Sequence, residues 1–220
     1  MRSIRSILFD LDGTLIDTNR LVIESFQYTL KVHLGREVSA REIVPTFGRP
    51  LLDALRRFSA EKAESMLETY RSYNEARHDA ATTLIPGVRE TLAILKEAGV
   101  TLAVVTSKRR NLAWRGLRLF GLDQYMAVVI TPEDTTRHKP DPDPILKALT
   151  LLEESPRHSL MVGDSPFDLA CGRNAGVKTA AALWSALPRE LLLAEKPDFQ
   201  LRKITDLLDL CLPLNRAVRA

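Results

Sequence analysis

The feature that most constrains the fold of this 220-residue chain is an alternation of short apolar runs with amphipathic segments beyond residue 84. The apolar runs, each suited to one buried strand, lie at 100–105, 127–130, 160–162 and 178–183. Segments with helical periodicity lie between and around them, at 88–98, 110–120, 142–152 and 167–175. This alternation predicts an α/β fold with a doubly wound parallel sheet and helices on both faces.

Another apolar run, residues 7–9, stands near the N-terminus and predicts the first strand. The segments that follow it have helical patterns, at 18–33, 40–44, 51–58 and 60–80. Because this stretch contains no convincing strand pattern, we expect an all-helical insert directly after the first strand. The predicted organisation is a core formed by residues 1–16 and 82–220, with the helical insert at 17–81.

The composition, 45% hydrophobic and 27% charged, is that of a folded globular protein. A net charge of +3 is typical of a mixed solvated surface and does not indicate nucleic-acid binding. No apolar run approaches the roughly 18 residues that span a bilayer, and the N-terminal one is too short for a signal peptide. Cys171 and Cys211 lack metal-binding spacing and are expected to be reduced, packed thiols. We therefore expect a cytoplasmic protein, with no indication of its oligomeric state.

Polar side chains follow the predicted strands at their carboxyl ends, where doubly wound sheets bind ligands. Asp10 and Asp12 follow the first strand, and two carboxylates so close favour a bound cation or a shared proton. Gly13 allows the main chain to approach a ligand closely. The later strands are followed by Thr106, Ser107, Lys108, Lys139, Asp164, Ser165 and Asp168. Carboxylates for a hard cation, beside hydroxyls and ammonium groups for anionic oxygens, indicate phosphoryl chemistry with Mg²⁺.

Each of these groups also has an ordinary structural explanation when it is taken alone. The two acids after the first strand could form an acidic turn. Thr106 and Ser107 could cap a helix, and Lys139 could be a solvated loop residue. Asp164 and Asp168 could cap the helix that follows them. Their joint occurrence at four successive strand ends favours the functional interpretation.

Four segments resemble the motifs of the haloacid dehalogenase (HAD) superfamily, in the same order along the chain. They are Asp10-Leu11-Asp12-Gly13-Thr14, Thr106, Lys139, and Gly163-Asp164-Ser165 with Asp168. The resemblance spans nearly the whole chain. It implies a Rossmann-like core, with the helical insert acting as a small mobile cap over the site.

The same resemblance implies a division of roles among the motif residues in a phosphatase reaction. Asp10 would be the nucleophile and form an aspartyl-phosphate. Asp12 would protonate the leaving oxygen and later take a proton from water. Thr106, the Ser107 amide and Lys139 would stabilise charge on the transferring phosphoryl oxygens.

The cofactor implied by the resemblance is Mg²⁺. Asp10, the main-chain carbonyl of Asp12, and Asp164 would hold it, and Asp168 would act through water or as a support. Asp12 also argues against a dehalogenase, because dehalogenating relatives lack this second acid. A mutase such as β-phosphoglucomutase shares all four motifs and stays among the alternatives.

The stretches around the motifs, including TSKRR, HKPDPDP and KPDFQL, resemble the PpaX-type inorganic pyrophosphatases and the neighbouring phosphoglycolate phosphatases. The cap loop around Arg49 favours the pyrophosphatase type. Pyrophosphate is compact and highly charged, so it needs cations and has no use for an apolar pocket. Lys108 and Arg49 are therefore predicted to bind its second phosphate at a cation-rich, apolar-poor edge. Gly13, Thr14 and Ser107 complete the predicted substrate contacts.

The expected activity is Mg²⁺-dependent hydrolysis of pyrophosphate, a small phosphorylated substrate, to two phosphates. Action on phosphoglycolate or another small phosphomonoester is a second hypothesis, and a non-catalytic phosphate-binding module is a third. The pair of Asp10 and Asp12 speaks against a pure binder, which needs no acid–base residue. Ser185, where relatives commonly have glycine, departs from the subfamily pattern without touching the four motifs.

Overall fold

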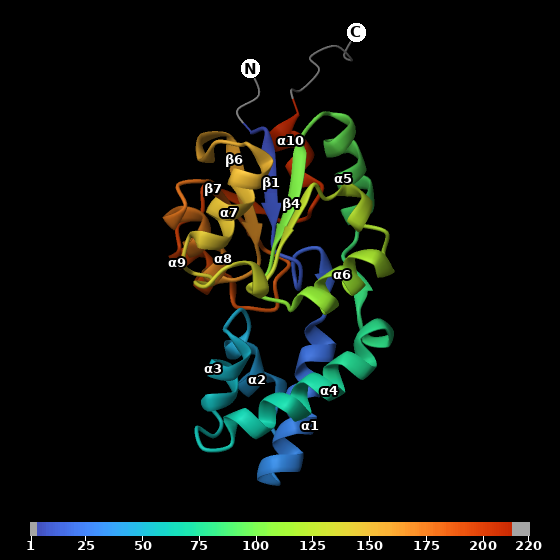
Figure 1. Ribbon diagram of the computed structural model, residues 1–220, viewed down its shortest axis with the longest axis vertical. Coiled ribbons are helices and arrows are strands. Elements are labelled where there is room, and N and C mark those ends of the chain that lie inside the picture. Colours follow the sequence, from blue (N-terminus) through green and yellow to red (C-terminus); the bar gives the residue numbers. More distant parts are fainter. Residues whose placement is uncertain (1–3, 213–220) are drawn as a thin grey trace.

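Six parallel strands form the central sheet in the order β5-β4-β1-β6-β7-β8 (Figure 1). They are β1 Ser6–Phe9, β4 Thr101–Val105, β5 Val128–Ile130, β6 Ser159–Gly163, β7 Lys178–Ala182 and β8 Phe199–Leu201. The first strand lies between β4 and β6, and its last residue, Phe9, pairs with Val104 on one side and Val162 on the other. This computed structural model describes residues 4–212, and it confirms the predicted parallel sheet.

Helices cover both faces of the sheet because alternate residues of each strand point to opposite sides. Ile7 and Phe9 belong to one apolar cluster, which also contains residues of α5 Val88–Glu97, α6 Arg110–Leu119 and α10 Asp206–Cys211. Leu8 belongs to a second cluster, formed with α7 Asp143–Leu152 and α8 Pro166–Asn174. The central strand is therefore buried on both faces, and its carboxyl end is a position at which neighbouring strands can bring polar groups together.

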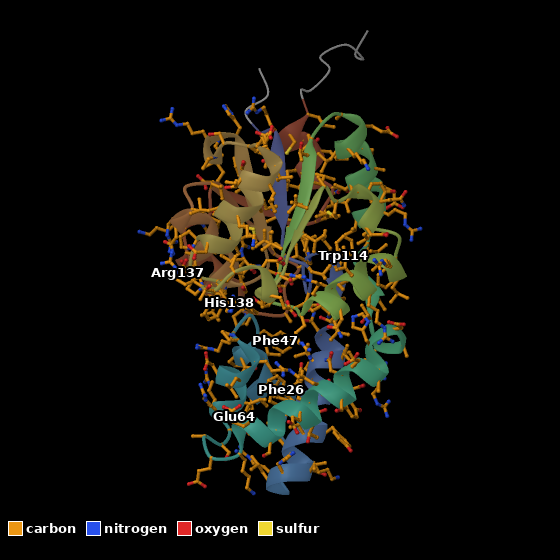
Figure 2. The ribbon with its side chains drawn as sticks, in the orientation of Figure 1. Phe26, Phe47, Glu64, Trp114, Arg137 and His138 are labelled. Carbon is orange, nitrogen blue, oxygen red and sulfur yellow. The ribbon has the colours of Figure 1, made fainter. Side chains whose placement is uncertain are left out.

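Four helices between β2 and β3 form a separate layer below the sheet in Figure 1. They are α1 Asn19–Leu34, α2 Ala40–Ile43, α3 Leu51–Arg56 and α4 Ala63–Ala81. These helices share an apolar cluster of their own, centred on residues such as Phe26 and Met66. Phe47 lies between this layer and the sheet (Figure 2) and packs against apolar clusters of both. Among residues 4–212, no helix is long and apolar enough to cross a membrane.

The sequence patterns do not predict several short elements that the structure contains. An antiparallel pair, β2 Ile16–Asp17 and β3 Thr83–Leu84, joins the two points where the chain enters and leaves the helical layer. The strand β8 and the short helices α9 Arg189–Ala194 and α10 are also additions. Strands of two or three residues are too short to show a period, so only pairing in the folded chain defines them. The proposed division into a core and a cap at residues 16/17 and 81/82 stays a prediction.

Candidate active site

Three buried acids meet at the carboxyl edge of the sheet. Asp10 directly follows β1, Asp164 directly follows β6, and Asp168 lies in the first turn of α8. Their exposed fractions are 8%, 7% and 3%, and one carboxylate oxygen of each lies within 4.8 Å of the others. Burial of three carboxylates so close together is costly unless positive charge offsets it.

Lys139 supplies one such positive charge from the loop after β5. Its Nζ donates to Asp10 Oδ1 at 2.7 Å and to Asp168 Oδ1 at 2.6 Å, and its side chain is 3% exposed. The interpretation of Lys139 as a solvated loop residue is therefore wrong. Among residues 4–212, one ammonium against three carboxylates leaves two negative charges without a buried cationic partner, which is the charge of one divalent cation. Oxygen donors with this charge suit Mg²⁺.

The pKa values of these groups follow from their burial and mutual repulsion. Burial raises the pKa of Asp10 to about 7, although Lys139 opposes the shift, and the charge of Asp168 adds to it. Burial, with the charges of Asp168 and Asp10, raises the pKa of Asp164 well above its ordinary value. For Lys139, burial lowers the pKa, but the two carboxylates outweigh it and the net pKa is raised. Without a metal, the cluster therefore favours the uptake of protons.

The repulsion among these buried carboxylates predicts that, in metal-free protein, the contribution of Asp10 to the free energy of unfolding falls as pH rises. A raised pKa in the folded state means that the Asp10 contribution to stability is lost as pH rises from about 4 to about 7. The Asp10→Asn variant should therefore exceed the native chain in unfolding free energy near pH 7.5, by on the order of 2–4 kcal/mol. The difference should shrink towards pH 4. Urea unfolding in the presence of a chelator measures it.

His78 acts in the opposite direction over part of this range, since burial lowers its pKa. The comparison between the native chain and the Asp10→Asn variant cancels that contribution, because both contain His78. A variant that is less stable than the native chain at pH 7.5 would contradict the predicted strain at Asp10.

Asp164 and Asp168 are each fixed by a neighbouring serine. Asp168 Oδ2 accepts from the Ser165 backbone N–H at 3.1 Å and from its hydroxyl at 2.7 Å, in a capping box at the start of α8. Asp168 therefore caps the helix and also binds Lys139. Ser185 donates to the Asp164 main-chain oxygen at 2.7 Å and lies 3.1 Å from its Oδ2. The sequence interpretation did not place Ser185 at the site, although it follows β7 at the same edge of the sheet.

Gly13 and Thr14 lie directly against Asp164. Gly13 has a φ of 80°, and a Cβ at this position would lie 2.2 Å from Asp164 Oδ2. Its N–H donates to the Ile16 carbonyl at 2.7 Å. Thr14 is fully buried, with its hydroxyl 3.5 Å from Asp164 Oδ1. Within the described part of the chain, neither residue lines the cavity, so their predicted contacts with substrate stay predictions.

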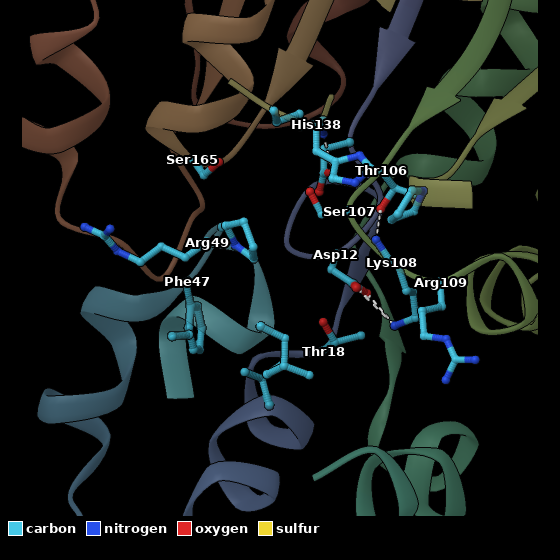
Figure 3. Close-up of a pocket in the computed structure, with 18 of the residues that line it drawn as sticks. Asp12, Thr18, Phe47, Arg49, Thr106, Ser107, Lys108, Arg109, His138 and Ser165 are labelled. Atoms are coloured by element: carbon cyan, nitrogen blue, oxygen red, sulfur yellow. Dashed lines mark hydrogen bonds and ion pairs between the residues drawn. The ribbon is translucent and has the colours of Figure 1, made fainter. Parts of the chain in front are cut away.

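Asp12 and Lys108 form an ion pair beside the buried acids (Figure 3). The Nζ of Lys108 lies 2.9 Å and 3.0 Å from the two carboxylate oxygens of Asp12. The Lys108 backbone N–H donates to the Thr106 hydroxyl at 3.1 Å, which fixes the turn after β4. Ser107 is exposed in the same turn and lines the cavity. The alternative explanation of Thr106 and Ser107 as a helix cap does not hold, because α6 begins at Arg110 and its N-cap is Arg109.

Arg49 lies apart from the other predicted substrate contacts. Its side chain points away from Asp12 and Lys108 in Figure 3, and its guanidinium lies 5.6 Å from the centre of the Phe167 ring. The preceding residue, Gly48, has a φ of 76°, and a Cβ there would lie 2.7 Å from Ser165 Cβ. The loop of the helical layer therefore contacts the start of α8 directly, and Arg49 borders the cavity at that contact.

A cavity of about 460 Å³ connects these groups. Its sheet side presents Asp10, Asp12, Thr106, Lys139 and Asp164. Its opposite wall comes from the helical layer and is largely apolar, with Val22, Phe26, Phe47, Leu51 and Leu67. The expectation of an apolar-poor substrate edge is therefore wrong. Helical periodicity identifies apolar faces but not which residues of those faces border the site.

Comparison with known proteins identifies relatives along nearly the whole chain. Residues 7–182 match the family model described as haloacid dehalogenase-like hydrolase. A PpaX protein from Caldanaerobacter subterraneus is 55% identical over 93% of this chain and 93% of its own length. Pyrophosphatase PpaX from Anoxybacillus flavithermus is 42% identical over 94% of this chain and 97% of its own length. The solved structure of a haloacid dehalogenase-like family hydrolase from Streptococcus pneumoniae matches with a TM-score of 0.86 and 27% sequence identity. The match covers 94% of this chain and 98% of that chain.

Proposed function

The chain belongs to the haloacid dehalogenase-like hydrolase family, and we propose that it is an inorganic pyrophosphatase that uses Mg²⁺ to hydrolyse pyrophosphate to two phosphates. The observation that carries the proposal is the buried cluster of Asp10, Asp164 and Asp168 with Lys139, beside the acid–base candidate Asp12. The similarity to PpaX proteins supports pyrophosphate as the substrate. We propose a cytoplasmic location for this activity.

Three groups would hold Mg²⁺ directly in this proposal: the Asp10 and Asp164 carboxylates and the main-chain carbonyl of Asp12. Asp168 already binds Lys139 and Ser165, so its proposed role is to support the site or to act through water. The donor set fits the ion because, within the described part of the chain, two of the buried negative charges lack a cationic partner. When bound, Mg²⁺ offsets negative charge on the transferring phosphoryl group.

The side chains of the site then divide the reaction into two steps. In the first, an Asp10 oxygen attacks phosphorus, the bond to the bridging oxygen breaks, and Asp12 gives its proton to the departing phosphate. In the second, water attacks the aspartyl-phosphate, loses a proton to Asp12, and releases the second phosphate. Thr106, the Ser107 amide and Lys139 stabilise charge on the phosphoryl oxygens.

Lys108 links acid–base chemistry to substrate binding in this proposal. It pairs with Asp12 while its side chain is 8% exposed, so a pyrophosphate entering the cavity would meet this ammonium beside the acid. Because Asp12 must carry a proton to act as an acid, we expect Lys108 to move from Asp12 to the second phosphate. Arg49, which lies over the Phe167 ring and borders the same cavity, is the second cation proposed for this phosphate.

A side-by-side assay tests the proposed substrate. Phosphate release from pyrophosphate and from phosphoglycolate is measured with the same Mg²⁺-loaded protein. We expect a kcat/KM for pyrophosphate at least about tenfold higher, because two phosphates engage both Lys139 and Lys108. Treatment with a chelator should abolish turnover, and added Mg²⁺ should restore it. Faster hydrolysis of phosphoglycolate, or full activity after chelation, would overturn the proposal.

A further inference from the structure

The oxygens that the acid cluster can offer to a cation are limited by the hydrogen bonds that they already accept. Asp168 has both carboxylate oxygens occupied, Oδ1 by Lys139 at 2.6 Å and Oδ2 by the Ser165 hydroxyl at 2.7 Å. Asp10 has Oδ1 occupied by Lys139 at 2.7 Å. Within the part of the chain that the structure describes, Asp10 Oδ2 and the Asp12 main-chain oxygen accept no hydrogen bond. Both are therefore free to bind a cation.

The two carboxylate oxygens of Asp164 have different surroundings. The Ser185 hydroxyl donates to the Asp164 main-chain oxygen at 2.7 Å and lies 3.1 Å from Oδ2, so its one proton is shared between these acceptors. Gly13 lies against the same oxygen, because a Cβ at this position would be 2.2 Å from Oδ2. In the described part of the chain, the one hydrogen-bond contact of Oδ1 is long, 3.5 Å from the Thr14 hydroxyl. Asp164 therefore has one free carboxylate oxygen.

Ser185 is held in place from outside the cavity. Its N–H donates to the Ala182 carbonyl at 3.2 Å in the turn after β7, and its hydroxyl accepts from the Leu187 N–H at 3.0 Å. Leu187 is buried and belongs to an apolar cluster with Leu169. Ser185 is not among the described residues that line the cavity, so contact with substrate is not its role.

We propose that Ser185 is a positioning residue that restricts Asp164 to one metal-binding oxygen and thereby favours Mg²⁺ over Ca²⁺. Mg²⁺ demands near-ideal octahedral geometry and keeps several waters, whereas Ca²⁺ takes roughly six to eight oxygens and can bind both oxygens of one carboxylate. Single oxygens from Asp10, Asp12 and Asp164 suit the smaller ion. A second oxygen from Asp164 would favour the larger one. This inference rests on the proposed function and adds a residue that sets the selectivity of its metal site.

The Ser185→Ala variant is expected to lose selectivity between the two ions. Without the hydroxyl, Asp164 Oδ2 loses its hydrogen bond, and the carboxylate can turn to present both oxygens. Removing such an outer partner typically weakens metal binding about 10–100-fold, so we expect the dissociation constant for Mg²⁺ to rise about tenfold. Binding of Ca²⁺ should weaken less, so the ratio of the two dissociation constants should shift towards Ca²⁺ by at least about fivefold.

Thermal unfolding of substrate-free protein over a series of Mg²⁺ or Ca²⁺ concentrations measures both constants. An ion that binds only the folded state raises its stability with concentration, so weak binding is also detected. The metal-free melting temperature of each variant, recorded in the same series, separates an effect on folding from an effect on binding. A lower melting temperature with an unchanged ratio of the constants would indicate a purely structural role and overturn the proposal. Equal weakening of both ions would overturn it too.

Two further variants test whether the hydroxyl itself is responsible. Ser185→Thr retains a hydroxyl and should keep the native ratio of dissociation constants within about twofold. Ser72→Ala, at an exposed serine of α4, is the matched control for loss of a hydroxyl and should alter neither constant. A loss of selectivity in Ser185→Thr as large as in Ser185→Ala would contradict the role assigned to the hydroxyl.

These titrations contain no substrate, so their outcome is separate from that of the pyrophosphatase assay. A Ser185-dependent ratio in a protein that does not hydrolyse pyrophosphate would leave this inference standing and overturn the proposed function. Pyrophosphate hydrolysis with a ratio independent of Ser185 would do the reverse. Absence of Mg²⁺ binding by the native chain would overturn both.

Discussion

The Asp10→Asn variant is expected to lose pyrophosphate turnover by about 10⁴-fold or more, while keeping its fold. An amide oxygen is a poor nucleophile and cannot form the aspartyl-phosphate. The surrounding structure should tolerate the change, because the amide has nearly the shape of the carboxylate and removes one buried negative charge. Phosphate release under saturating Mg²⁺ measures the loss.

A single-turnover experiment makes the assignment specific to Asp10. Protein quenched in acid after mixing with radiolabelled pyrophosphate should retain label in the native chain and none in the Asp10→Asn variant. Asp209→Asn, at an exposed acid of α10, is the matched control and should behave like the native chain. Retained turnover or retained label in the Asp10→Asn variant would show that another group attacks phosphorus.

The Lys139→Met variant is expected to lose both activity and stability. Removing the ammonium leaves Asp10 and Asp168 without their shortest ion pairs, at 2.7 Å and 2.6 Å. Loss of one partner from a buried ion pair costs about 3–5 kcal/mol, so the metal-free variant should unfold at much lower urea concentration near pH 7.5. The kcat/KM should fall about 10³-fold, because charge on the phosphoryl oxygens loses its buried cation.

Magnesium and pH should each repair part of the stability loss. Mg²⁺ binding supplies positive charge to the same carboxylates, and binding to the folded state alone stabilises it. Near pH 5 the deficit should also shrink, because the raised pKa values of Asp10 and Asp164 let these acids take up protons. Lys203→Met, at an exposed lysine, is the control. A metal-free Lys139→Met variant as stable as native at pH 7.5 would mean that Lys139 does not balance the cluster.

The apolar pattern was sufficient to predict the parallel sheet and its helices. Residues 7–9 and 100–105 are runs that only a strand buried on both faces would need, and they become β1 and β4. The motif acids could also be predicted to meet, because they follow parallel strands, whose carboxyl ends lie at one edge of the sheet. The short pair β2–β3 escaped prediction because two residues show no period.

Side-chain partners inside the site could not be predicted in the same way. Lys108 was expected on substrate but pairs with Asp12, and Arg49 lies over Phe167. Ser185, which differs from the subfamily pattern, hydrogen-bonds Asp164. These contacts join residues far apart in sequence, and their geometry depends on how loops and helices pack together.

The sequence by itself determined the type of chemistry. Two acids beside a buried strand, a later lysine and two further acids define a phosphoryl site once a parallel sheet brings the ends of its strands to one edge. Only the tertiary structure decided how their charges are balanced and what faces them. Lys139 is buried between Asp10 and Asp168, and the apolar wall of the helical layer lies across the cavity. The physical reason is that charge compensation and cavity shape depend on distances between separate elements, which local sequence patterns do not encode.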